Sequence, residues 1–351
     1  MADAFKDELE FTLICRNFRL KKIAGIDSFY PLLQTFLHSE LYHNFMHSLL
    51  YSLPYFTLNS MKDLTDKIAS ATVFYFTLIG IALANGIEEI PTGLCTLYTL
   101  AYIVSDTAID NPRLSREERQ QFIGYVHERF IGRRSEKSSS LYLIDESDRK
   151  KVDFLLALIC KMEELRPDLT EKIERVFSCH LVAAINQYSH EDDMEYLKNK
   201  TEAKGVETME IVFAILQIDL TEESRSWCGF IQRLDDLLDF EDDLQEGVYN
   251  HAIASYLRDG HLDHEILDCS KRIMRSDGTI PFIFTQILIY IISHTTRLST
   301  STRSIFQRIL GSTDFYQSFT IPSFCEILLE EFQITLSMLE KFLSDISARK
   351  I

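Results

Sequence analysis

The chain contains few of the residues that interrupt helices. Its 351 residues include only 12 glycines and 7 prolines, and no glycine-rich phosphate loop is found. Polar and apolar residues nowhere alternate over a stretch long enough to build a sheet. These absences argue against mixed and all-β folds, and they favour an all-α protein.

Basic residues are also scarce. Against 53 Asp+Glu there are 36 Lys+Arg, so the net charge is −17 at pH 7. No basic patch offsets this excess, so nucleic acid is not an expected partner and an anionic membrane surface is disfavoured. The acidic residues gather at 191–195 and 235–246. A solvated face suits the first cluster, whereas the second suggests a cation site.

Paired cysteine motifs and an apolar leader are missing. The seven cysteines are widely spaced without a CxxC pair, so we expect free thiols and a cytoplasmic protein. Residues 68–87 carry no charge and could be mistaken for a membrane span. Because this stretch is solitary and contains polar residues, we expect a fully buried core helix and no stable membrane insertion.

Helical patterns cover most of the chain. Pro91 is predicted to open a helix that stops before Pro112, because the residue before a proline avoids the helical region. Gly205 is predicted to interrupt a helix and Thr221 to start one. We predict helices at 68–85, 92–110, 117–130, 147–166, 170–200, 206–218, 221 through the acidic stretch, 262–274, 281–297, 303–310 and 322–347, short helices within 6–60 that break near Pro31 and Pro54, and a loop at 132–140.

The most informative stretch is LDDLLDFEDDLQEGVYN, residues 234–250. Asp235, Asp239, Asp242 and Asp243 stand at i, i+4, i+7 and i+8, which on a helix span a sector of about 100°. Carboxylates at this spacing repel one another unless water, protonation or a cation relieves them. The oxygen-rich face suits a hard divalent cation such as Mg²⁺.

A second pair of carboxylates precedes Pro112. Asp106 and Asp110 stand at i and i+4 in the last turn of a predicted helix, where the helix dipole favours cations. Two aspartates at this spacing often occur by chance, but with the acidic stretch they predict two facing walls around an apolar cavity. Aromatic candidates for its lining, most of them expected in the core, are Phe74, Tyr75, Phe76, Tyr98, Tyr102 and Phe213, with Tyr98 and Tyr102 favoured by their four-residue steps from Asp106.

Both places resemble motifs of class I terpenoid synthases, in particular the squalene-synthase-like branch with its large bacterial terpene synthases, and an atypical fungal humulene-forming group. SDTAID at 105–110 resembles a first motif D-x-x-x-D, and residues 235–250 resemble D-x-x-x-D-x-x-E/D-D followed seven residues later by Asn250. The chain lacks the DDxxD form of common synthases and an N-D-x-x-S-x-x-x-E motif. The resemblance implies a single-domain all-α bundle around a central apolar cavity, with N-terminal helices over 1–60 and a catalytic bundle over 61–351.

The resemblance also implies an activity. A magnesium-dependent terpene synthase, most simply a sesquiterpene synthase of secondary metabolism, would ionise farnesyl diphosphate, release diphosphate and convert the carbocation to a terpene as a monomer or homodimer. Up to three Mg²⁺ ions would hold the diphosphate. The implied metal ligands are Asp106 and Asp110 on one wall and Asp235, Asp239, Asp242 and Asp243 on the other, with Asp106, Asp110 and Asp239 as the catalytic residues.

Other side chains are expected to hold the diphosphate itself. Asn250 completes the second motif. Lys204 precedes Gly205 at a predicted helix break, where backbone N–H groups could also meet an anion. Arg233 is a weaker candidate, because it can pair with an acid on its own helix.

Two other functions fit the same residues. A chain-joining or chain-elongating prenyltransferase would need a second substrate site, for which Arg113 and Arg116 are available. A noncatalytic helical interaction protein would use the acidic stretch to bind a basic partner, and it predicts that the two aspartate clusters do not face each other.

The histidine pairs His43/His47 and His261/His264 are not expected to bind zinc, because the first lacks the glutamate of a zinc-protease helix and the second lies in a polar, surface-like run.

Overall fold

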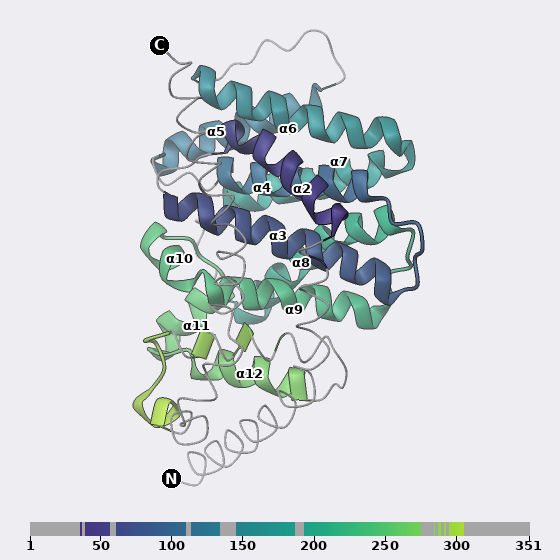
Figure 1. Cartoon of the computed structure of the whole chain (residues 1–351). Helices are drawn as coiled ribbons and strands as arrows, with labels where there is room; N and C mark the ends of the chain where they lie inside the picture. The colour runs from purple at the N-terminus through teal and green to yellow at the C-terminus, as the bar shows by residue number, and fades with distance from the viewer. Residues whose placement is uncertain are drawn as a thin grey trace. The chain divides into compact units, whose positions relative to one another are not determined.

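The computed structural model is helical in the part of the chain that it describes (Figure 1). It describes residues 36, 39–56, 61–109, 114–133, 145–186, 193–274, 284, 287, 288, 291, 292 and 295–304. No strand occurs among these residues, and the all-α prediction is confirmed for them. None of the described helices combines the length and apolar character needed to cross a membrane.

The elements are α2 (Glu40–Ser52), η1 (Leu53–Tyr55), α3 (Met61–Ala84), α4 (Thr92–Ile109), α5 (Arg116–Ile131), α6 (Glu146–Leu165), η2 (Pro167–Leu169), α7 (Thr170–Asn186), α8 (Met194–Leu216), α9 (Glu222–Leu238), α10 (Phe240–Glu246), α11 (His251–Asp259) and α12 (Asp263–Met274). Backbone contacts group the described residues into two compact units. We call residues 36–233 and 241–250 the N-terminal unit, and residues 234–240 and 251–304 the C-terminal unit. The organisation of the whole chain as one domain stays a prediction.

Helix α4 is the central helix of the N-terminal unit. It contacts α2, α3, α5, α6 and α8. Its buried residues are Leu94, Cys95, Tyr98, Thr99, Leu100, Ala101, Ile103 and Val104. They include consecutive positions, which point to different sides of a helix, as expected where neighbouring helices cover several faces.

Helix α3 is only half covered, so the prediction that its uncharged sequence is fully buried is wrong. The buried residues follow steps of three and four: Ile68, Ala71, Thr72, Tyr75, Leu78, Ile79 and Ala82. Val73 and Leu83 on the other faces are 42% and 55% exposed. One buried stripe is enough to hold a helix, even when the remaining faces also carry apolar residues.

Several predicted boundaries need correction. The helix predicted at 170–200 is two helices, α7 and α8, and the Asp193 side chain caps the first turn of α8. Gly205 lies inside α8 and does not interrupt it. Helix α11 was not predicted, because its nine residues carry too short a periodic signal.

The remaining predictions either can be compared directly with the structure or fall outside the described residues. Thr221 starts α9 as predicted, since its Oγ1 accepts a hydrogen bond of 3.1 Å from the Ser224 N–H. Residues 295–299 are not helical, so the helix predicted to reach residue 297 is too long. The five described cysteines, Cys95, Cys160, Cys179, Cys228 and Cys269, are free thiols. The predictions for Pro31, for 134–140 and for 322–347 lie outside the described residues.

Candidate functional site

Asp106 of the first motif lies near the end of α4 and is paired with a lysine of α3. Its Oδ2 atom accepts a hydrogen bond of 2.8 Å from Lys67 Nζ. The side chains of Lys67 and Asp106 are 30% and 35% accessible, so the pair is open to solvent. Asp110, the second aspartate of the motif, lies outside the described residues.

Aromatic residues continue from this ion pair into the core between α3 and α4. Phe74 and Tyr102 stack with ring centroids 4.7 Å apart, and Phe74 also meets Tyr98 at 5.9 Å. Phe74 follows Lys67 by seven residues and Tyr102 precedes Asp106 by four, so each helix presents both residues on one face. The two antiparallel helices thus place an aromatic stack next to a charged pair.

Tyr98 has a structural role. It is 2% exposed, and its hydroxyl donates a hydrogen bond of 2.7 Å to the Thr208 carbonyl of α8. Burial raises the pKa of Tyr98, which keeps the hydroxyl protonated. Tyr75 is also core, 1% exposed and stacked on Phe45. Of the two favoured lining candidates, only the partly exposed Tyr102 keeps access to the region beside Asp106.

The acidic stretch is not one helix, so the prediction of four aspartates on one helical face is wrong. Helix α9 ends at Leu238 and α10 begins at Phe240, with Asp239 between them. The Asp239 N–H still donates to the Asp235 carbonyl at 3.0 Å, so the break falls just after this turn. Aspartate disfavours helix interiors, and repulsion between acids four residues apart adds to this preference.

The boundary between the two units falls shortly after this break, between Phe240 and Glu241, and it divides the predicted ligands. Asp235 and Asp239 belong to the C-terminal unit, whereas Asp242 and Asp243 on α10 belong to the N-terminal unit with Asp106. Asp239 and Asp242 are exposed, and Asp235 and Asp243 are partly exposed. None of the four residues is buried in the core.

Asn250 of the second motif returns to Asp243 through a turn. Asn250 Nδ2 donates a hydrogen bond of 2.7 Å to Asp243 Oδ2. Gly247, with φ of 71°, follows α10, and the Val248 N–H donates to the Asp243 carbonyl at 3.0 Å. This is a Schellman arrangement, in which a glycine at positive φ ends the helix. The seven-residue spacing of the motif therefore corresponds to a direct contact.

Lys204 does not lie at a helix start. It is an exposed residue inside α8, where the backbone N–H groups bond within the helix, so the predicted backbone anion site at Lys204 and Gly205 is wrong. Gly205 instead permits close packing against α9, because a Cβ atom there would collide with the Cys228 carbonyl oxygen. A Cβ on Gly229 would likewise lie 2.9 Å from Glu202 Cβ. The two glycines let α8 and α9 cross in close contact.

Arg233 lies in the same crossing of α8 and α9. It is 2% exposed, and its Nη1 lies 3.5 Å from Glu202 Oε1. A buried guanidinium paired in this way fixes two helices together. Its burial leaves little of the group available to an anion in solvent.

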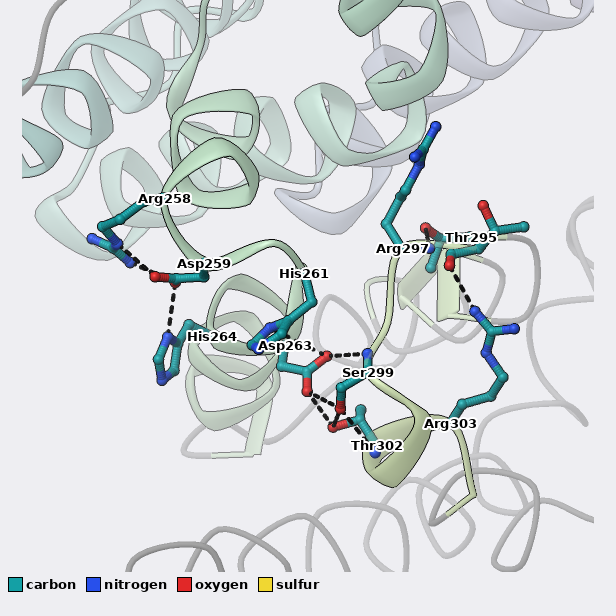
Figure 2. A network of polar contacts seen from close by, with 11 residues as sticks. Arg258, Asp259, His261, Asp263, His264, Thr295, Arg297, Ser299, Thr302 and Arg303 are labelled. Atoms are coloured by element: carbon teal, nitrogen blue, oxygen red, sulfur yellow. Dashed lines mark hydrogen bonds and ion pairs between the residues drawn. The ribbon is translucent and has the colours of Figure 1, made fainter.

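A separate polar cluster in the C-terminal unit surrounds Asp263, the first residue of α12 (Figure 2). Asp263 Oδ1 accepts from the Ser299 N–H at 3.0 Å, and Oδ2 accepts from Ser299 Oγ at 2.5 Å and Thr302 Oγ1 at 2.6 Å. The Thr302 N–H donates to Ser299 Oγ at 3.2 Å. These bonds fasten the start of α12 to the helical turn at 300–304.

The histidines beside this cluster pair with carboxylates. His264 Nδ1 lies 3.0 Å from Asp259 Oδ2, and Arg258 holds the same carboxyl group and lowers its pKa (Figure 2). His261 Nδ1 lies 3.8 Å from Asp263 Oδ1. Within the part of the chain that the structure describes, no three His, Cys, Asp or Glu side chains come close enough together to hold a metal ion.

Lys67 is the charged residue that the sequence analysis missed. It lies 39 residues before Asp106 and belongs to no motif. The one available signal was the antiparallel arrangement of two apolar helices around the short turn at 85–91, which brings residues on either side of it into register.

Comparison of the chain with family models, with curated proteins and with solved structures found no match.

Proposed function

We propose that the protein is a magnesium-dependent class I terpene synthase that ionises a linear prenyl diphosphate and converts the carbocation to a terpene. Farnesyl diphosphate is the first choice of substrate. The proposal starts from the resemblance of residues 105–110 and 235–250 to the two aspartate motifs of that class. It is supported by the way these residues are held.

The contact between Asn250 and Asp243 carries the proposal. Seven residues separate them in the sequence, yet the amide nitrogen and the carboxylate oxygen are 2.7 Å apart. An oriented carboxylate is what a metal-binding motif requires, because its partners fix the direction of its ligand oxygen.

The donor type suits Mg²⁺, although the described residues do not bring three such side chains together at one point. Asp106, Asp242 and Asp243 belong to the same compact unit, each has a solvent-accessible side chain, and carboxylate oxygens are the ligands this ion prefers. When bound, Mg²⁺ would neutralise the diphosphate and improve it as a leaving group. Asp110, Asp235 and Asp239 remain proposed ligands by their motif positions.

The chain's own residues would then perform three tasks. The aspartates hold the charged end of the substrate, and Asn250 keeps the Asp243 carboxylate in one orientation. Phe74 and Tyr102, which stack on each other between α3 and α4, would supply aromatic surface for an allylic cation on the side of Asp106. Arg233, being buried against Glu202, supports the α8–α9 crossing instead of binding diphosphate.

The test is turnover of defined substrates by the full-length chain. Geranyl, farnesyl and geranylgeranyl diphosphate are each incubated with the protein and Mg²⁺ or EDTA, and pyrophosphate release and volatile products are measured. We expect metal-dependent release from at least one substrate and a terpene product. No release from any allylic diphosphate would reject the proposal.

Variants locate the site. Asp106→Ala and Asp239→Ala are expected to abolish turnover while leaving the helical circular dichroism signal intact. Asp219→Asn, an exposed aspartate in the loop between α8 and α9, is the control and should turn over like the original protein. A product in which two prenyl chains are joined, or one chain is lengthened, would favour the chain-joining or chain-elongating prenyltransferase. Full activity in both alanine variants would show that the site is misplaced.

A further inference from the structure

We draw no further inference here: the strongest candidate, the exposed apolar surface of helix α3 with Val73 and Leu83, carries nothing because the described part of the chain does not show what covers it.

Discussion

Asp106 and Asp263 both lie near helix ends, yet their carboxylates are held in different ways. Asp263 accepts three hydrogen bonds from neutral donors of one neighbouring segment, Ser299 to Thr302 (Figure 2). Asp106 is paired with the charged end of a flexible lysine. The Asp263 side chain is 17% accessible, half the 35% of Asp106.

The difference indicates which carboxylate is structural. Neutral donors fixed by the backbone of a helical turn remain in place, and the three bonds occupy most of the about four acceptor sites of the Asp263 carboxylate. A lysine partner with solvent access is easily replaced by another cation. Asp263 is thus suited to joining two segments, whereas Asp106 is suited to binding a ligand reversibly.

The strongest test of this difference is the same substitution, aspartate to asparagine, at both positions. We expect Asp106→Asn to reduce pyrophosphate release about a thousandfold, equal to about 4 kcal/mol of activation free energy, because the proposed metal ligand is lost. Its free energy of unfolding should change by less than about 1 kcal/mol. Asp263→Asn, the matched control, should keep its turnover per folded molecule. Equal losses of turnover in both variants would contradict the division into structural and available carboxylates.

Stability should show the reverse order. Asp263→Ala removes the acceptor of three hydrogen bonds and leaves the Ser299 and Thr302 donors without it, so we expect unfolding in urea to cost about 3 kcal/mol less. Asp106→Ala loses one exposed ion pair, so its free energy of unfolding should fall by about 1 kcal/mol or less. An Asp263 variant as stable as the original chain would show that this cluster does not fasten α12.

A smaller effect is expected from the donor side of the same cluster. Ser299→Ala removes one hydroxyl that donates to Asp263 and accepts from the Thr302 N–H, so both a tertiary bond and a helix cap are lost. We expect a loss of about 1.5 kcal/mol in urea unfolding. Ser304→Ala is a suitable control, because that exposed hydroxyl bonds only within its own helical turn, to the Thr300 carbonyl. Similar losses in the two variants would assign the effect to local helix propensity.

The helices were predictable from the sequence because their signals are local. Pro91, the cap at Thr221 and runs of apolar residues located α4, α5, α6 and the start of α9 without any tertiary information. The full burial expected for residues 68–87 was wrong, because hydropathy does not tell how many neighbours a helix has. That number is set by packing, and α4, not α3, is surrounded.

The errors in the site have physical causes as well. Gly205 was interpreted as a break, although a glycine inside a helix also serves close packing, and only the position of α9 distinguishes the two roles. The break at Asp239 results from competition between acid repulsion and helix continuity that a fixed periodicity ignores. The Asn250–Asp243 spacing was found, whereas Lys67 required the antiparallel pairing of two helices.

The partly buried histidine His180 on α7 is expected to make the stability of the chain depend on pH. Burial, and secondarily the charge of Lys204, lower the pKa of His180 on α7 to about 4. The unfolded chain, in which histidine has a pKa of about 6.5, therefore binds more protons than the folded chain between these values. The contribution of His180 to the free energy of unfolding is fully present above about pH 6.5, and it is lost as the pH falls towards about 4.

The neighbours of His180 define the control for this last effect. Glu207 lies 3.6 Å from His180 and has a pKa raised by burial, which acts in the opposite direction, and Arg175 pairs with Glu210 nearby. The difference between the original chain and His180→Gln isolates the histidine, because these carboxylates are present in both. We expect urea unfolding of the original chain to lose about 1 kcal/mol more between pH 7 and pH 5 than that of the variant, after allowance for the 23% of the side chain that reaches solvent. Parallel pH profiles would mean that His180 keeps a pKa of about 6.5 in the folded chain, because the nearby Glu207 carboxylate offsets the effect of burial.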